Sequence, residues 1–187
     1  MRIIGGVFKG KKIEFVKSSV TRPLKDLVKE SIFNIINHSK IIRFNLIRAS
    51  VLDLYSGIGS FGIECISRGI KNITFVEKDS NVIKILKKNL ISLSALESAN
   101  IINSDTKDYF KKLDNKNKFE IVFLDPPFAD KENFIQDLIY IKKLKILTDN
   151  HIVIIHRESK SLDNLDNIIK IILTKKYGRS KIIFGKV

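Results

Sequence analysis

The chain has 187 residues and 44% of them are hydrophobic, which suits one domain with a substantial core and room for a small appendage. Its formal net charge of +14 favours a polyanionic partner, and nucleic acid is the partner that we expect, with a general lysine bias as the alternative. One cysteine and three scattered histidines exclude an intrachain disulfide and argue against a metal site. Without a long apolar run or a signal peptide, we expect a cytoplasmic monomer that does not enter a membrane.

Residues 1–40 are predicted to form a basic extension in front of a main domain that covers residues 41–187. Residues 2–16 are typical of a β-hairpin, because two short apolar runs flank a glycine-containing turn. The basic side chains of this extension could contact a phosphate backbone, and a solvated hairpin without a partner is the alternative. The predicted contacts are Arg2, Lys9, Lys11, Lys12 and Arg22.

A helix is predicted to begin at Pro23, where the missing N–H of proline costs nothing. Its buried face should consist of apolar residues at helical spacing, and charged residues such as Lys29 should lie off this face. The predicted face comprises Leu24, Leu27, Val28, Ser31, Ile32, Ile35 and Ile36. Residues 37–48 are predicted to connect this helix to the main domain, with a short helix of their own.

From residue 49 onward, strand patterns alternate with helix patterns. Strands are predicted at residues 50–54, 72–77, 100–103, 119–124 and 151–155, followed by a final strand pair at 168–174 and 181–184. Helices are predicted at residues 59–68, 80–93, 106–113 and 131–145, with Cys65 in the core and Ser80 as a helix cap. Such alternation predicts an α/β fold with a mainly parallel sheet, helices on both faces and a ligand site at the carboxyl ends of the strands.

Residues 51–62 combine a short apolar strand, a glycine-rich turn and the start of a helix. Gly57 and Gly59 allow the backbone to approach a ligand closely, and the helix start offers backbone N–H groups. Together with Gly62 they also match the dinucleotide fingerprint, for which Glu77 stands at the position of the ribose-binding acid. A nicotinamide enzyme and a turn without any ligand are therefore open alternatives at this point.

Asp53 changes the interpretation of this turn. The resulting pattern, Asp-x-x-x-Gly-x-Gly, is similar to that of class I methyltransferases. In those enzymes the loop holds the amino-acid part of S-adenosylmethionine, and a later acid holds the ribose hydroxyls. This resemblance implies that Glu77 binds the ribose and that Asp105 accepts a hydrogen bond from the adenine amino group, unless Asp105 is only a helix cap.

A second motif, Asp125-Pro126-Pro127-Phe128, follows the fourth main strand directly. Two consecutive prolines fix two φ angles and remove two donors, so this loop can offer a carboxylate and a carbonyl to a planar amine. Phe128 can stack on the ring that carries the amine. The tetrapeptide resembles the motif of methyltransferases that act on exocyclic amino groups of nucleobases. Acceptors on the N–H bonds favour a pyramidal nitrogen whose lone pair is directed at the methyl group, and Asp125 need not be a full general base.

Several further segments resemble the bacterial small-subunit rRNA guanine-N2 methyltransferases, the RsmD family. They are residues 1–13, Arg22-Pro23, residues 29–34, Phe75–Asp79, the Asp-Pro-Pro-Phe loop and Tyr177-Gly178. This resemblance implies a class I Rossmann-like fold, S-adenosylmethionine as cofactor, and methylation of N2 of one guanine in 16S rRNA of the small subunit or its assembly intermediate. The chain departs from the family pattern at Leu24, at Tyr55-Ser56 and at Ile58.

The motifs and the resemblance together define the predicted site. The cofactor-binding residues are Asp53, Tyr55, Ser56, Gly57, Gly59, Glu77, Lys78 and Asp105, and the catalytic residues are Asp125, Pro126, Pro127 and Phe128. No metal is expected. The alternatives are an adenine-N6 methyltransferase on RNA or DNA and a non-catalytic RNA-binding factor in ribosome assembly.

Overall fold

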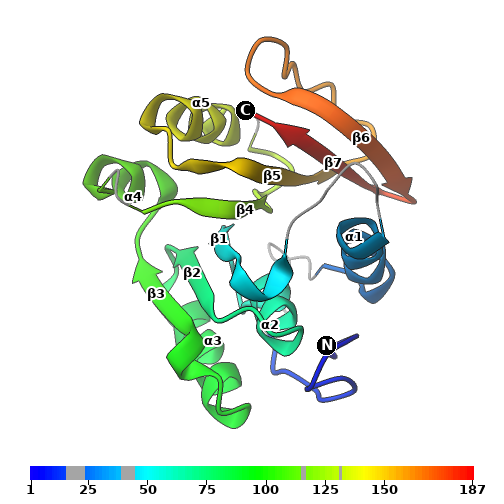
Figure 1. Cartoon of the computed structure of the whole chain (residues 1–187), viewed down its shortest axis with the longest axis vertical. Coiled ribbons are helices and arrows are strands. Elements are labelled where there is room, and N and C mark those ends of the chain that lie inside the picture. Colours follow the sequence, from blue (N-terminus) through cyan, green and yellow to red (C-terminus); the bar gives the residue numbers. More distant parts are fainter. Residues whose placement is uncertain (16–23, 39–44, 115–116, 131) are drawn as a thin grey trace.

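The computed structural model describes residues 1–15, 24–38, 45–114, 117–130 and 132–187. They form a seven-stranded sheet in the order β3-β2-β1-β4-β5-β7-β6 (Figure 1). The strands are β1 Ser50–Leu54, β2 Asn72–Glu77, β3 Ala99–Asn103, β4 Phe119–Leu124, β5 Leu147–Glu158, β6 Lys170–Tyr177 and β7 Ser180–Lys186. The helices are α1 Asp26–His38, α2 Ser60–Ser67, α3 Ser80–Ser92, α4 Thr106–Lys112 and α5 Asn133–Leu144, with the 3-10 helices η1 Leu46–Arg48 and η2 Leu96–Ser98.

Strands β1 to β5 are parallel, and β7 runs antiparallel to both β5 and β6. The predicted mainly parallel sheet with an antiparallel final strand is therefore confirmed, and each strand and helix of residues 50–187 lies close to its predicted range. The main difference is β5, which is longer at both ends than predicted: Leu147 pairs with Phe119 of β4 before a register shift, and residues 156–158 pair with β7. No helix within the described residues is both long and apolar enough to cross a membrane.

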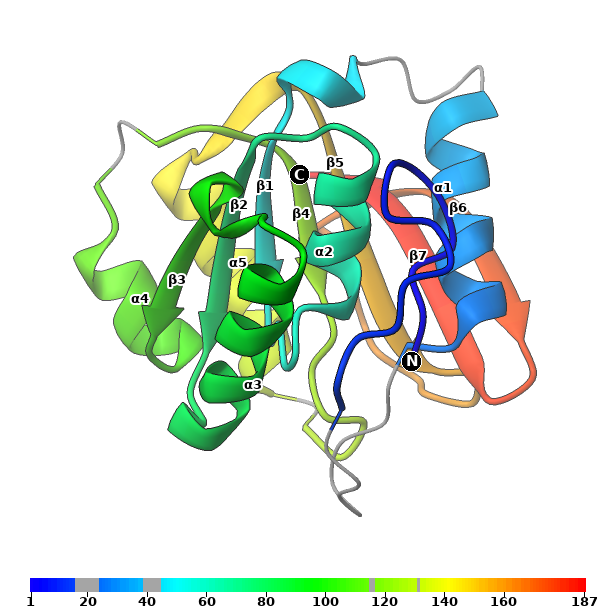
Figure 2. The same ribbon diagram turned by 90° about the horizontal axis from the view of Figure 1, so that it is seen from below.

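Helices cover both faces of the sheet and divide the core into two clusters. Apolar residues of α1, α2 and α3 pack on one face, and those of α4 and α5 pack on the other (Figure 2). Alternate residues of β1 belong to opposite clusters, with Val51 in one and Leu52 and Leu54 in the other. Burial on both faces explains why β1 and β4 have almost continuous apolar sequences.

The predicted N-terminal hairpin is present but shorter than predicted: Ile3 N–H donates to the Lys11 carbonyl and Ile13 N–H to the Met1 carbonyl, each at 3.0 Å. Residues 1–15 form a turn-rich loop with one isolated antiparallel bridge between Arg2 and Lys12, and no regular strand. Between the paired segments, backbone donors bind α2: Ile4 and Gly5 donate to the Glu64 carboxylate at 2.8 Å each, and Val7 N–H donates to the Ser67 carbonyl at 2.7 Å. Docking on α2 thus satisfies donors that the short pairing leaves free.

Two predictions for the buried face of α1 are wrong. Leu27 of α1 is 65% exposed, whereas Lys29 is fully buried. The Lys29 ammonium donates to the Arg2 carbonyl at 2.7 Å and lies 3.8 Å from Glu64, so the loop and the acid on α2 give this charge its partners. Burial lowers the pKa of Lys29, and the nearby carboxylates of Glu64 and Asp26 oppose that shift.

The helix boundaries need two further corrections. The first residue described in α1 is Asp26, and the predicted start at Pro23 lies outside the described residues. The N-cap of α3 is Asp79 and not Ser80, because the Asp79 carboxylate accepts the backbone N–H groups of Asn81 and Val82.

We expect Glu64→Ala to lower the free energy of unfolding by about 3–5 kcal/mol, because a buried ammonium and two backbone donors lose their acceptor. Urea denaturation measures this change. Glu14→Ala is the matched control, since Glu14 lies 4.0 Å from Lys88 with both side chains more than half exposed, and its cost should stay below about 1 kcal/mol. Equal costs for the two variants would contradict the assignment of Glu64 as the anchor of the N-terminal loop.

Candidate active site

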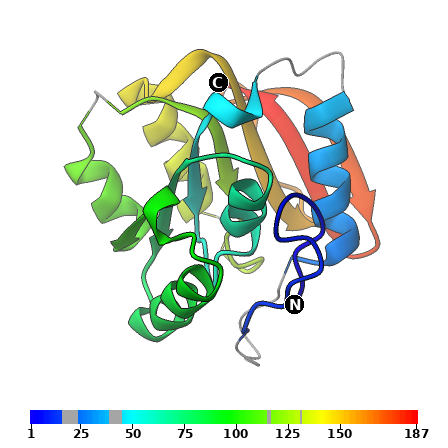
Figure 3. The same cartoon turned by 60° about the horizontal axis from the view of Figure 1, so that its bottom comes forward.

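One cavity of about 1370 Å³ lies at the carboxyl ends of the parallel strands. Figure 3 shows that the arrowheads of these strands point to the same side of the molecule, as the fold class predicts. The cavity brings together most of the predicted cofactor-binding residues and all the predicted catalytic ones. Those that line it are Tyr55, Ser56, Gly57, Glu77, Lys78, Asp105, Asp125, Pro126, Pro127 and Phe128.

The glycine turn after β1 is held by the acid at the end of β2. Glu77 accepts the Gly57 N–H at Oε2 and the Asp79 N–H at Oε1, both at 2.9 Å. Gly57 has a φ of 55°, and a Cβ added there would meet no protein atom within 4 Å. The turn therefore leaves open space beside its backbone, into which a ligand can come close.

The donor and acceptor groups around this turn fit a polar cofactor. Ser56 Oγ is buried and has no hydrogen-bond partner among the described residues, which is unusual for a native protein and consistent with a ligand contact. The Asp105 carboxylate caps α4 by accepting the Asp108 N–H at 2.8 Å through Oδ1, and Oδ2 is available for another donor. Two carboxylates and an unpartnered hydroxyl suit the ribose, amine and adenine groups of a nucleoside.

Asp53 and Gly59 do not line the cavity. Asp53 is 1% exposed and accepts the Gly62 N–H at 2.9 Å, so it joins β1 to the first turn of α2 behind the glycine loop. Burial raises the pKa of Asp53 well above its usual value, and the charges of Asp125 and Glu77 add to that rise. Asp53 therefore supports the glycine loop from the side away from the cavity. It also binds the Gly62 N–H, one of the helix N–H groups that were predicted to face a ligand.

Asp137, which the sequence did not reveal as a site residue, lines the cavity next to Tyr55. The Tyr55 hydroxyl donates to Asp137 Oδ2 of α5 at 2.6 Å and lies 3.4 Å from Thr106 Oγ1 of α4. Burial raises the pKa of Asp137 to about 6, against the opposing effect of the Tyr55 hydrogen bond. Tyr55 has a φ of 58°, a costly conformation for an aromatic residue, and this anchoring of its side chain to α5 helps to hold it.

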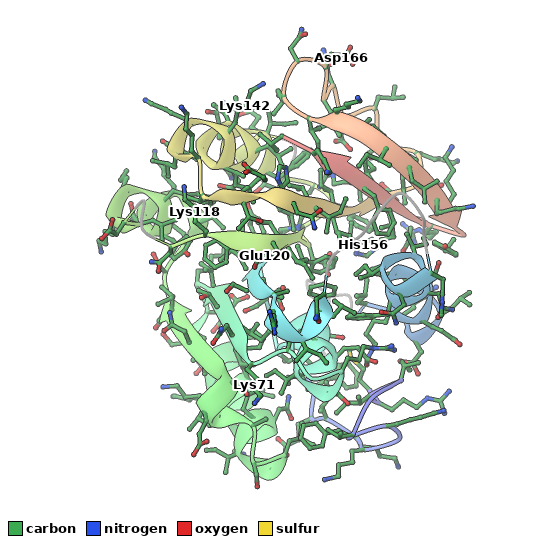
Figure 4. All side chains as sticks on the ribbon, in the orientation of Figure 1. Lys71, Lys118, Glu120, Lys142, His156 and Asp166 are labelled. Carbon is green, nitrogen blue, oxygen red and sulfur yellow. The ribbon has the colours of Figure 1, made fainter. Side chains whose placement is uncertain are left out.

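Asp125 follows β4 and is bound to a histidine. His156 Nδ1 of β5 lies 2.8 Å from Asp125 Oδ1, and the His156 ring meets the Phe128 ring edge-on at a centroid distance of 5.2 Å. Figure 4 labels His156 near the carboxyl end of β4. Nothing in the sequence marks this residue, because the contact arises only when β4 and β5 pair with Leu124 beside Ile155.

The backbone of the Asp-Pro-Pro-Phe loop is held by a second residue that the sequence did not reveal. Arg157 is fully buried, and its guanidinium donates to the carbonyls of Pro127 and Phe128 at 3.3 and 3.4 Å. The Asp163 carboxylate accepts two further bonds from the same group, and the guanidinium also lies 4.2 Å from the centroid of the Phe134 ring. These carbonyls are therefore engaged within the protein, which leaves the Asp125 carboxylate and the Pro126 carbonyl as acceptors for an amine.

The predicted RNA-contacting residues lie outside the cavity. Lys9, Lys11 and Lys12 are exposed on the N-terminal loop, Arg2 pairs with Asp26 at 2.9 Å, and Arg22 lies outside the described residues. The same N-terminal region nevertheless reaches the cavity, since Met1 and Leu24 line it. Within the described residues, no group of three or more histidine, cysteine or acidic side chains could hold a metal ion.

The chain was compared with known proteins. The family described as Conserved hypothetical protein 95 matches residues 1–186. The protein is 40% identical to ribosomal RNA small subunit methyltransferase D of Haemophilus influenzae over 129 residues, which cover 68% of this chain and 64% of that protein. It is 33% identical to the protein of the same name from Buchnera aphidicola subsp. Baizongia pistaciae over 178 residues, or 86% of this chain and 87% of that protein.

Among solved structures, the Escherichia coli protein yhhF superimposes with a TM-score of 0.84 at 26% identity, covering 99% of this chain and 96% of that one. The first of the sequence relatives is thus matched over slightly less than two thirds of its length, whereas the family and the structure are matched over nearly their whole length. The fold, the arrangement of the motifs and these similarities agree. The chain belongs to the Conserved hypothetical protein 95 family, the RsmD-like family of class I S-adenosylmethionine-dependent methyltransferases.

Proposed function

We propose that this protein transfers a methyl group from S-adenosylmethionine to the exocyclic N2 amine of one guanine in small-subunit ribosomal RNA. The observation that supports the proposal most is the shared cavity, which the glycine turn after β1 and the Asp-Pro-Pro-Phe loop after β4 both line. The names of the relatives supply the RNA class, and the chemistry of the second loop supplies the amine.

In this proposal the cofactor lies across the ends of β1, β2 and β3. The turn formed by Tyr55, Ser56 and Gly57 holds the amino-acid part, and Ser56 Oγ supplies a hydrogen bond that it lacks within the described protein. The Glu77 carboxylate, which already accepts two backbone N–H groups, accepts the ribose hydroxyls with its remaining lone pairs. Asp105 Oδ2 accepts from the adenine amino group, and Lys78 lines the same end of the cavity.

Methyl transfer then depends on positioning. The guanine N2 lone pair is delocalised into the ring, and acceptors at Asp125 and the Pro126 carbonyl draw its N–H bonds out of the ring plane. A bond forms between N2 and the methyl carbon while the bond from sulfur to that carbon breaks, so the sulfonium becomes a thioether. The methylated amine sheds a proton, which the Asp125 carboxylate accepts, and the Phe128 ring stacks on the base.

The RNA would approach from the side of the N-terminal loop. Three exposed lysines lie on that loop, whose start borders the cavity at Met1. The turn between β6 and β7 also borders the cavity through Arg179, which is 70% exposed and pairs with Glu158. These two basic segments beside the opening form a surface that can bind phosphates while one base enters the cavity.

Methylation of adenine at N6 needs the same two acceptors. The two activities are therefore distinguished by identifying the methylated base in the product RNA. The test is methyl transfer from labelled S-adenosylmethionine to small ribosomal subunits from a strain that lacks this protein, with nucleoside analysis of the product. We expect label in N2-methylguanine. Label in N6-methyladenine would replace the guanine assignment, and no transfer to any RNA would favour a non-catalytic assembly factor.

Asp125→Ala should lower kcat by about 100-fold or more, because the amine loses its charged acceptor in the transition state. The affinity for S-adenosylmethionine, measured by calorimetry, should change by less than about threefold because Asp125 faces the amine and not the cofactor carboxylate. Asp149→Ala, at the exposed beginning of the neighbouring strand β5, is the matched control and should keep full activity. Retention of kcat in Asp125→Ala would remove this residue from the mechanism.

Replacing Lys9, Lys11 and Lys12 together with glutamate should weaken RNA binding and reduce the slope of log K against log salt by about 2. Cofactor affinity should not change, because none of these lysines lines the cavity. The matched control replaces Lys112, Lys142 and Lys143, which lie on α4 and α5 across the sheet, with the same change of charge. An identical salt slope in both triple variants would exclude the N-terminal loop from the RNA interface.

A further inference from the structure

His156 is buried beside the proposed catalytic loop and has a hydrogen-bond partner at each ring nitrogen. Nδ1 lies 2.8 Å from Asp125 Oδ1, and Nε2 lies 2.9 Å from Ser180 Oγ of β7. The His156 side chain is 5% exposed, whereas that of Asp125 is 23% exposed and borders the cavity. Both residues line the cavity, and the imidazole is the more deeply buried of the two.

The partners determine which nitrogen carries the proton. An ionised carboxylate can only accept, so Nδ1 must donate to Asp125. In the neutral ring Nε2 is then an acceptor, and the Ser180 hydroxyl is the donor that it meets. Asp125 thus selects the tautomer and the Ser180 hydroxyl adapts to it, while the Phe128 ring meets the imidazole edge-on and limits its rotation.

We propose that His156 is a positioning residue for methyl transfer, which holds Asp125 Oδ1 through Nδ1–H so that Oδ2 alone meets the amine. This inference rests on the proposed function. A carboxylate on a loop after a strand could otherwise turn about its side-chain bonds and present either oxygen. A single fixed oxygen holds one N–H bond of the amine in a set direction, and with it the nitrogen lone pair that must point along the line from nitrogen through the methyl carbon to sulfur.

Arg157, the next residue of β5, holds a different part of the same loop. Successive side chains of a strand point to opposite faces, so Arg157 leaves the sheet on the other side and holds the loop backbone at Pro127 and Phe128. In that loop His156 makes a hydrogen bond to the Asp125 side chain and an edge-on ring contact with Phe128. Replacing the imidazole with an apolar side chain that still packs against Phe128 should therefore leave the loop in place and affect chiefly the carboxylate.

The experiment compares His156→Leu, which removes both ring nitrogens, with His156→Asn, whose side-chain N–H can occupy the position of Nδ1. His156→Leu should lower kcat by about 100-fold, while the cofactor Kd and the KM for RNA change by less than about twofold. His156→Asn should recover kcat to within about fivefold of wild type, because it restores the donor to Asp125. In the Asp125→Asn background, His156→Leu should lower the remaining rate no further, since the two residues act as one unit.

His151→Asn is the matched control, because His151 lies on the same strand with its Nδ1 against the Thr148 carbonyl and its Nε2 accepting the Val187 N–H. It should keep wild-type kcat. If the wild type is active and His156→Leu has the same kcat, this inference is overturned and the proposed function stands. Equal losses in His156→Leu and His156→Asn, or a further loss in the Asp125→Asn background, would also overturn it. A wild type that transfers no methyl group to any RNA would overturn both proposals.

Discussion

The pairing of β1 with β4 is the constraint on which the candidate active site depends. The two strands are parallel and in a register that sets Leu54 beside Leu124, and the Asp125 N–H lies 3.4 Å from the Leu54 carbonyl. Both strands are buried on both faces, so their side chains must be almost entirely apolar until the strands end. The first polar groups after each strand consequently emerge side by side, one loop suited to a cofactor and the other to an amine. A different strand order would have separated these loops.

Buried charges hold the irregular backbone around this centre. Glu64 accepts two backbone N–H groups of the N-terminal loop, Arg157 donates to two carbonyls of the Asp-Pro-Pro-Phe loop, and Asp53 accepts an N–H at the start of α2. Each of these segments lacks the regular hydrogen bonds of a helix or strand at that point. Burying a charge is costly, but a charged group that pairs with several backbone groups holds a loop more firmly than a neutral one. The cavity is thus lined by loops whose backbones are fixed from behind.

The proposed function would separate affinity for RNA from chemistry. The lysines of the N-terminal loop lie outside the cavity, whereas the groups suited to methyl transfer lie within it. Contacts to phosphate contribute affinity that depends on salt and not on sequence, and the fit of one base into a narrow site contributes specificity. The proposed function would use both features, the exposed lysines to bind phosphates of the RNA and the cavity to hold one base beside the cofactor. The N-terminal loop joins the two, since it carries the lysines and begins at the cavity wall.

The sequence by itself determined the order of the elements in residues 50–187, the fold class and the two loops at the ends of β1 and β4. Those features are local: hydrophobic periodicity gives strands and helices, and glycine and proline fix the backbone of the loops. The tertiary structure alone decided that Lys29 is buried, that the first 15 residues dock on α2 without regular strands, and that Asp53 lies behind the glycine turn. It also revealed His156, Arg157 and Asp137, whose bonds to Asp125, Pro127 and Tyr55 span 30 or more residues of the chain. No local pattern marks such residues, because a polar side chain becomes a partner only when sheet register and helix packing bring a second one to it.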